Sequence, residues 1–138
     1  MSNQKALGNP LIMSWQAYVT QNMVGTGKIS KGAIYGHNGG VWAASDGFKI
    51  SDAEFKKIFG AFQNPSEIIA SGILLNGDKF FALRYDDRSI YGKRGQTGCV
   101  IVKTKQTILI GIYPESVQPG EANKVMEGLG DYLIGMQY

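Results

Sequence analysis

The sequence predicts an α+β fold in which helices pack on the faces of one central antiparallel β-sheet. The chain has 138 residues, a length that suits a single domain with a core of its own. Apolar residues repeat with the helical period near both ends of the chain and once between them. Short apolar runs separated by turn residues follow one another from residue 71 to residue 113, which is typical of an antiparallel meander. Both kinds of element on so short a chain indicate one sheet covered by helices.

Residues 1–12, MSNQKALGNPLI, show no helical or strand period, and Gly8, Asn9 and Pro10 are turn formers. We therefore expect a flexible N-terminal extension or an expression remnant. Met13 is then the natural start, and residues 13–138 form a single domain.

A first helix is predicted from Ser14 to about Met23. Ser14 is a suitable N-cap, because its hydroxyl can accept a hydrogen bond from a backbone N–H of the first turn. The apolar positions are Trp15, Tyr18, Val19 and Met23. Gly25 and Gly27 are expected to end the helix.

Two short strands are predicted over residues 28–36 and 40–44, with Trp42 on the second. The intervening His37-Asn38-Gly39-Gly40 contains an Asn-Gly pair, which favours a tight hairpin.

A second helical segment is predicted within residues 46–62. Ser51 and Glu54 have the spacing of a capping box, and Asn64-Pro65 should end the segment. Its apolar positions are Phe55, Ile58, Phe59 and Phe62. The strands of the meander are then expected over residues 71–75, 79–85, 88–92, 98–104 and 107–113.

A closing helix is predicted over residues 118–138. Pro119 suits a first turn, where no N–H is needed, and Glu121 places a negative charge near the positive end of the helix dipole. The apolar stripe comprises Ala122, Val125, Met126, Leu129, Leu133 and Met136. Tyr132 lies off this stripe, so its ring is expected at the surface.

Composition limits the possible classes of protein. The chain is 43% hydrophobic and 18% charged, and Cys99 is its single cysteine, which suits a reducing compartment such as the cytoplasm. No apolar run approaches the roughly 20 residues of a membrane span, and the start lacks the pattern of a signal peptide. The net charge of +3 permits an acidic partner but does not by itself indicate nucleic acid.

The sequence offers little for catalysis, so we expect no enzyme, no cofactor and no metal site. Residues 24–29 match a phosphate loop only in part, because Asn22 and Ile29 stand where it requires glycine and serine or threonine. His37 falls in a predicted turn, Cys99 in an apolar strand, and Asp86-Asp87 in another turn.

Two other patterns point to binding. Trp15 and Tyr18 are three residues apart, and Tyr132 and Tyr138 lie at the other end of the chain, so the four rings could form one aromatic surface if the terminal helices lie side by side. Between residues 79 and 105 the chain carries seven basic residues against two acidic ones, which favours acidic partners. Arg84 is four residues from Arg88, so in a regular strand both would point to the same side of the sheet.

Several separated segments resemble the profilin family, especially its fungal and amoebal forms. They are MSWQAYV at 13–19, GKISKGAIYGHNGGVWAAS at 27–45, DDRSIYGKRG at 86–95 and KTKQTILIGIYPESVQPGEANKVMEGLGDYLIGMQY at 103–138. The resemblance implies terminal helices together on one face of the sheet and smaller helices on the other. It also implies two sites, one for monomeric actin and one for proline-rich segments.

The resemblance assigns residues to each site. The polyproline site comprises Trp15, Tyr18, Trp42, Tyr132, Leu133 and Tyr138. The actin site comprises Lys79, Arg84, Arg88, Tyr91, Lys93, Arg94, Gln118, Gly120, Asn123 and Lys124. Anionic phosphoinositides would use Arg84, Arg88, Lys93 and Arg94 of the same surface. An extended polyproline helix is recognised by flat rings and by donors to its free carbonyls, so we expect Trp15 to be a stacking ring whose removal spares the fold.

The expected function is therefore that of a monomeric, non-enzymatic protein of the cytoplasm and actin cytoskeleton. It would bind actin monomers, regulate their polymerisation and link them to proline-rich proteins such as formins. One alternative is a small α+β domain that senses a metabolite between sheet and helix, which the aromatic ends argue against. A nucleic-acid binder is a weaker alternative, because the basic strands lack interleaved aromatic residues for base stacking.

Overall fold

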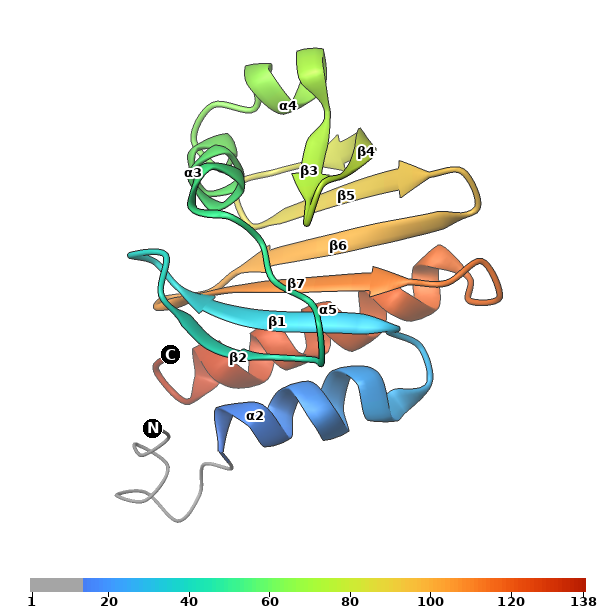
Figure 1. Ribbon diagram of the computed structural model, residues 1–138. Helices are drawn as coiled ribbons and strands as arrows, with labels where there is room; N and C mark the ends of the chain where they lie inside the picture. Colours follow the sequence, from blue (N-terminus) through green and yellow to red (C-terminus); the bar gives the residue numbers. More distant parts are fainter. Residues whose placement is uncertain (1–13) are drawn as a thin grey trace.

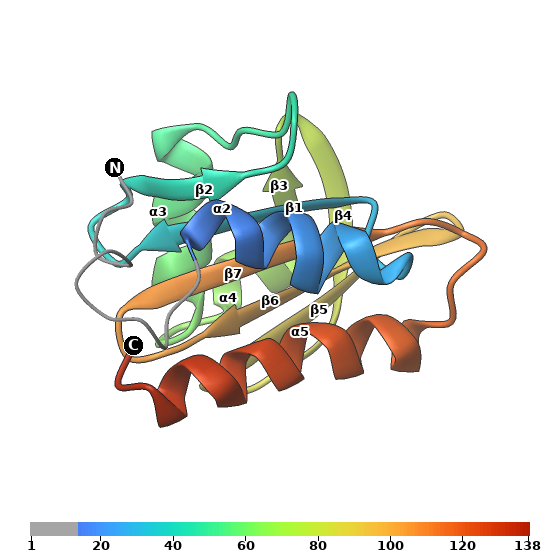
Figure 2. The ribbon, with the colours of Figure 1, turned by 90° about the horizontal axis from the view of Figure 1, so that it is seen from below.

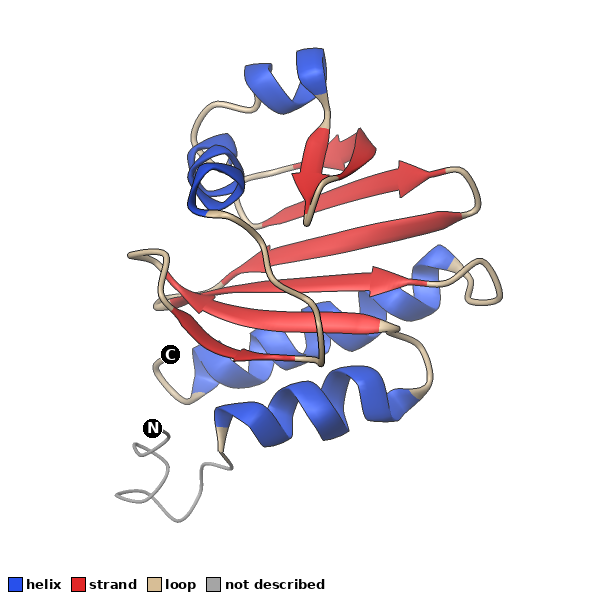
Figure 3. Cartoon of the chain, in the orientation of Figure 1, coloured by secondary structure: helices blue, strands red, loops and turns tan. Residues whose placement is uncertain are grey.

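The computed structural model describes residues 14–138 (Figure 1). The predicted extension over residues 1–12 and the proposed start at Met13 lie outside this range. Figure 3 shows where helix and strand fall along the chain. The elements are α2 (Trp15–Ala17), η1 (Tyr18–Met23), η2 (Val24–Thr26), β1 (Lys31–Gly36), β2 (Val41–Ala44), α3 (Asp52–Ala61), α4 (Ser66–Ser71), β3 (Ile73–Leu75), β4 (Asp78–Tyr85), β5 (Ser89–Arg94), β6 (Thr97–Lys103), β7 (Thr107–Tyr113) and α5 (Pro119–Gly135).

Within residues 14–138, seven strands form one sheet in the order β2-β1-β7-β6-β5-β4-β3. All neighbouring strands are antiparallel, and β3 to β7 are adjacent in chain order, so the predicted meander is confirmed. The N-terminal hairpin joins the last strand of the meander, because β1 pairs with β7 from Lys31 opposite Ile112 to Gly36 opposite Thr107.

Helices cover both faces of the sheet, as the α+β class predicts. Figure 2 shows the first helix and α5 side by side on one face, with α3 and α4 behind the sheet. Successive strand residues point to opposite faces, so the central strands β1, β6 and β7 supply both of the apolar cores. Ile34 packs in the core under the terminal helices, whereas Ala33 and Tyr35 pack in the core under α3 and α4.

The first helix is not the regular α-helix that its spacing predicts. Ser14 caps it as expected, because its Oγ accepts a hydrogen bond from the Ala17 N–H at 3.1 Å. The α-helical turn α2 then widens into the π-helix η1 and tightens into the 3-10 turn η2. The prediction that Gly25 ends the helix is wrong, because Gly25 lies inside η2. Gly27 ends it with φ 77°, a left-handed conformation that glycine adopts without steric cost.

The middle helix and the strand starts differ in part from prediction. The capping box of α3 is confirmed, because Ser51 Oγ accepts from the Glu54 N–H and Glu54 Oε1 from the Ser51 N–H. The helix α4 was not predicted, since its six residues are too few to show a period. It occupies residue 71, so β3 begins at Ile73, and β1 begins at Lys31 rather than at residue 28.

The closing helix has the predicted apolar stripe, but it spans Pro119–Gly135 rather than continuing to residue 138, because Gln137 takes a left-handed conformation. Ala122, Met126, Leu129 and Leu133 are buried, while Val125 and Met136 are partly buried against the same core. The helix lies close to the sheet at Gly111, where an added Cβ would come 2.6 Å from Met126 Sδ.

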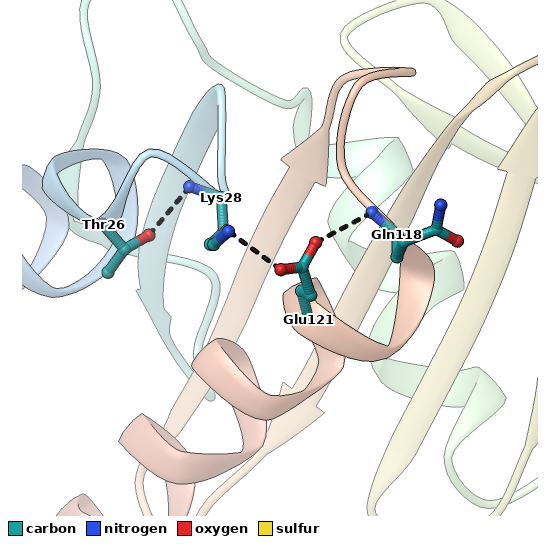
Figure 4. Close-up of polar contacts among 4 residues, drawn as sticks. All are labelled: Thr26, Lys28, Gln118 and Glu121. Carbon is teal, nitrogen blue, oxygen red and sulfur yellow. Dashed lines mark hydrogen bonds and ion pairs between the residues drawn. The ribbon is translucent and has the colours of Figure 1, made fainter.

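An ion pair joins the end of the first helix to the start of α5 (Figure 4). Lys28 Nζ donates to Glu121 Oε2 at 2.9 Å, and the Gln118 N–H donates to Glu121 Oε1 at 3.2 Å. Thr26 Oγ1 accepts from the Lys28 N–H at 3.0 Å, which fixes the loop that carries the lysine. These bonds, foremost the one from Lys28, lower the pKa of Glu121 from its ordinary value of 4.5.

The Glu121→Gln variant should show what the charge contributes. Because the native pKa of Glu121 is lowered, its carboxylate stabilises the fold above the unfolded pKa, and this contribution is lost as the pH falls through the native pKa. We expect the variant to be slightly less stable than the wild type near pH 7, with the difference shrinking as the pH falls through the native pKa of Glu121. Urea denaturation at neutral pH and in acid measures this, and a difference of the same size at both would contradict it.

Candidate functional site

Five aromatic rings from distant parts of the chain meet at one end of the paired terminal helices. We call them the ring cluster: Trp15, Tyr18, Trp42, Tyr132 and Tyr138. The Trp15 ring lies 4.8 Å from Trp42, 5.1 Å from Tyr138 and 5.6 Å from Tyr18 between ring centroids. Tyr18 in turn lies 6.1 Å from Tyr132, so the rings are in continuous contact at distances typical of aromatic pairs.

The edge strand β2 brings Trp42 to this cluster. Gln16 Nε2 donates to the Ala44 carbonyl at 2.9 Å, which ties the first helix to β2. Gly36 on β1 leaves room for the indole, because an added Cβ there would lie 2.7 Å from Trp42 Nε1. The position of Trp42 therefore depends on both neighbouring elements.

The ring cluster has a buried floor and an exposed surface. Trp42 and Tyr132 are 36% and 46% exposed, and Tyr138 is half-buried. Trp15 and Tyr18 are only 5% and 2% exposed. Trp15 therefore offers little accessible surface, because the other rings and the helical core cover it, and its assignment to the polyproline site stays a prediction. Leu133 is also fully buried and belongs to the same floor.

Burial changes the expected effect of Trp15→Ala. Removing a buried tryptophan leaves a cavity, and such truncations typically cost about 3–5 kcal/mol of stability. We expect the variant to lose a comparable part of its free energy of unfolding, so that any loss of binding would partly reflect unfolding. Urea denaturation of Trp15→Ala beside Trp15→Phe measures this, and a stability equal to that of the wild type would contradict it.

A groove runs from the ring cluster along the junction of the terminal helices. It has a volume of ≈ 450 Å³ and is lined by Tyr18, Asn22, Thr26, Val125, Gly128, Leu129 and Tyr132. Tyr18 and Tyr132 belong to both the groove and the ring cluster. The two together form an elongated, mainly apolar surface with polar groups along one side.

A second candidate surface lies on β4 and β5, on the face of the sheet that carries α5. Arg84 lies over the Tyr91 ring at 4.3 Å, and the Tyr91 hydroxyl donates to the Glu127 carboxylate on α5. Burial, and next the bond to Glu127, raises the pKa of Tyr91. Lys93 faces Phe81 across the strands and lies 5.8 Å from the Tyr113 ring. Lys79 of β4 is also exposed.

Two of the predicted basic residues are engaged within the molecule. The strand does not continue regularly from Arg84 to Arg88, because β4 ends at Tyr85 and Asp86 Oδ1 accepts from the Arg88 N–H in a turn. Arg88 reaches α5, where its guanidinium lies 2.8 Å from Asp131 and donates to the Glu127 carbonyl at 3.1 Å. Arg94 pairs with Asp78 at 3.5 Å.

Exposed apolar side chains on β3 and β4 were missed in the sequence. Phe81 and Leu83 are 65% and 62% exposed, and Leu74 of β3 lies beside them opposite Lys79. The run KFFALRY at 79–85 carries apolar residues on both faces of the strand, although helices cover only one of them here. Apolar residues on both faces of this strand were the sequence feature that could have predicted an exposed apolar patch.

The helical part of the predicted actin site lies at the start of α5. Gln118, Gly120 and Lys124 are exposed, and Asn123 is half-buried. Glu127, one turn further on, contacts Tyr91 of β5. The structure therefore places the helical and strand parts on the same face.

The residues considered for catalysis have other roles. His37 lies in the β1–β2 turn, where its Nε2 is 3.0 Å from the Thr104 carbonyl. Cys99 is buried in the core, and burial raises the pKa of its thiol to about 12. Across residues 14–138 there is no group of three or more potential metal-ligating His, Cys, Asp or Glu side chains. No helix in that range has the length and apolar character needed to cross a bilayer.

Comparison with known proteins places these features in context. The Profilin family model matches residues 13–138. Profilin from Saccharomyces cerevisiae is 50% identical over 127 residues, covering 91% of this chain and 100% of the yeast protein. The crystal structure of Acanthamoeba castellanii profilin II has a TM-score of 0.88 and 47% identity, covering 91% of this chain and 100% of that one. Mouse profilin IIa, in complex with a double repeat from the FH1 domain of mDia1, shares the fold with a TM-score of 0.77 and 23% identity, covering 91% of this chain and 100% of the mouse chain.

Proposed function

This chain belongs to the profilin family, and from that premise we propose that it binds monomeric actin and proline-rich segments through two separate surfaces. Its role is regulation of actin polymerisation by binding, without catalysis. The ring cluster is the observation that carries the proposal, since it brings together rings that the sequence places at opposite ends of the chain.

The proline-rich segment binds across the ring cluster. A polyproline II helix is already extended, so little conformational entropy is lost on binding, and its carbonyls have no internal partners. Trp42, Tyr132 and Tyr138 present accessible ring surface for stacking on the prolines. Trp15, Tyr18 and Leu133 support these rings from below. The groove beside the cluster gives the ligand its direction.

Actin binds a different surface from the ring cluster, formed by β4, β5 and the start of α5. The basic residues Lys79, Arg84 and Lys93 surround the exposed Phe81 and Leu83, an arrangement that suits an interface with an apolar centre and a charged rim. Arg88, Tyr91 and Arg94 contribute mainly by fixing this surface through their contacts with Asp131, Glu127 and Asp78. The helical contacts are Gln118, Gly120, Asn123 and Lys124.

Phosphoinositide headgroups bind the same basic residues, so they compete with actin. Arg84 and Lys93 are the best placed, because the described ion pairs engage Arg88 and Arg94 within the molecule. Each basic residue near an anionic leaflet contributes on the order of 1 kcal/mol, so binding should weaken as salt concentration rises.

Separate surfaces allow one molecule to hold actin and a proline-rich protein together. The complex of mouse profilin IIa with a double repeat from the FH1 domain of mDia1 supports this proposal. Formins are therefore the partner class that we propose here. The protein would act in the cytoplasm at the actin cytoskeleton, as a monomer.

Retention on immobilised polyproline, measured beside the affinity for actin monomers, tests the proposal directly. The wild-type protein should be retained and should bind actin in the same preparation. A folded protein that shows neither activity would overturn the proposal. That result would favour the alternative of a metabolite-sensing domain. Such a domain needs a cavity between sheet and helix, whereas in this chain buried apolar side chains pack there.

A further inference from the structure

The helix α5 ends in a Schellman motif with an unusual residue in its left-handed position. The Tyr138 N–H donates to the Leu133 carbonyl at 2.8 Å, and the Gln137 N–H donates to the Ile134 carbonyl at 3.0 Å. Gln137 has φ 72°. This position usually holds glycine, because a side chain is strained there, so Gln137 needs other contacts to keep the conformation.

The turn between β6 and β7 supplies those contacts. Lys105 Nζ donates to Gln137 Oε1 at 2.7 Å, and Gln106 Nε2 donates to the Gln137 carbonyl at 3.0 Å. The same turn holds the next residue, because Thr104 Oγ1 donates to the main-chain oxygen of Tyr138 at 2.9 Å and the Gln106 N–H donates to the same oxygen. Both residues after the helix are therefore bound to one turn.

The β6–β7 turn is itself fixed in the fold. Thr104 and Thr107 are buried, and Thr104 Oγ1 accepts from the Thr107 N–H at 3.0 Å. On its other side the His37 N–H donates to the Gln106 carbonyl at 3.2 Å. The turn thus connects the β1–β2 hairpin to the end of α5. These hydrogen bonds fix the position of the turn relative to the sheet.

We propose that the β6–β7 turn, residues 104–106 together with Thr107 at the start of β7, is a positioning element for the Tyr138 ring in the proline-binding surface. The inference rests on the proposed function, in which the half-buried Tyr138 is one of the rings that contact the prolines. The contacts hold Gln137 in its left-handed conformation, which turns the chain back. The Tyr138 ring then packs against the Trp15 ring in a T-shaped arrangement, with 5.1 Å between ring centroids. None of the four turn residues belongs to the ring cluster, so their effect on the ligand passes through Tyr138.

The test removes the two exposed side-chain contacts in the double variant Lys105→Ala/Gln106→Ala. Its affinity for a proline decamer should fall about fivefold, since each lost bond has a modest net effect. Affinity for actin monomers and the thermal midpoint should stay near the wild-type values. The near-ultraviolet circular dichroism of the free protein should weaken, because Tyr138 no longer packs firmly on Trp15. Lys56→Ala/Gln63→Ala, which removes the same residue types from exposed positions of the α3 region, is the matched control.

Adding Gln137→Gly to the double variant provides the decisive step. Glycine adopts positive φ without strain, so the Schellman motif should form without help from the turn, and the decamer affinity should recover most of its loss. Loss without recovery would overturn the positioning role, because the side chains would then act in another way. Unchanged affinity in the double variant would overturn it too. If the wild-type protein does not bind the decamer, the proposed function fails, and the circular dichroism then decides whether the turn places Tyr138.

Discussion

Replacing Trp42 with alanine should weaken binding of a proline decamer about 30- to 100-fold while the protein stays folded. Trp42 is the exposed ring that lies against Trp15, and it stands on an edge strand with 36% of its surface exposed. Loss of a central aromatic contact at a small interface typically costs 2 kcal/mol or more, which corresponds to about this factor. Trp42→Ala is therefore a better probe of binding than Trp15→Ala, whose effect includes the stability of the core.

The control for this prediction is Tyr85→Ala. Tyr85 is a ring of similar exposure, 41%, on β4 and outside the ring cluster. Decamer affinity, measured by titration calorimetry, should be unchanged in the control, and urea denaturation should show both variants folded. Wild-type affinity in a folded Trp42→Ala protein would exclude the ring cluster as the proline site.

Reversing the charge of Arg84 should have the largest effect on actin. Arg84 lies over Tyr91 beside the exposed Phe81 and Leu83, at the centre of the basic strands. Arg84→Glu replaces an attractive contact with a repulsive one against an acidic actin surface, and such like-charge contacts cost several kcal/mol at interfaces. We expect actin-monomer affinity to fall at least 100-fold while polyproline retention stays normal, because the rings lie elsewhere.

The Lys56→Glu variant separates this local effect from a change in net charge. Lys56 is an exposed residue of α3, on the other face of the sheet, and its substitution changes the charge by the same amount. It should bind actin as the wild type does. Binding to vesicles that contain phosphoinositide should fall in Arg84→Glu alone. If both variants lose actin equally, the charge acts at long range and the basic strands are not the contact surface.

The sequence predicted local structure well wherever the residues that define an element lie close together in the chain. The stripe of α5 follows from its period, and the α3 capping box follows from two residues three positions apart. The meander followed from short apolar runs separated by turn residues. One such pair is Asn76-Gly77, where both residues have positive φ. The π-helix η1 and the short helix α4 were not foreseen, because neither leaves a periodic pattern that differs from those of its neighbours.

The candidate site was predicted in its residue types more than in its geometry. The resemblance supplied Trp42, which pattern alone did not connect to the terminal rings. Exposure could not be predicted, because Trp15 and Trp42 are the same residue type and differ only in what covers them. The pairing of Arg88 with Asp131, and with it the reduced role of Arg88 at the surface, depends on how α5 crosses the sheet.

The sequence by itself therefore determined most of the elements, their order, the two faces of the sheet and the aromatic and basic character of the two surfaces. These depend on neighbours a few residues apart, whose spacing is written in the chain. Only the tertiary structure decided that Trp15 is buried and Trp42 is exposed, and that no helix covers Phe81 and Leu83. It also decided that the β6–β7 turn contacts Gln137 and Tyr138. Those outcomes depend on contacts between residues 20 to more than 100 positions apart, and their distances are fixed only when the helices pack on the sheet.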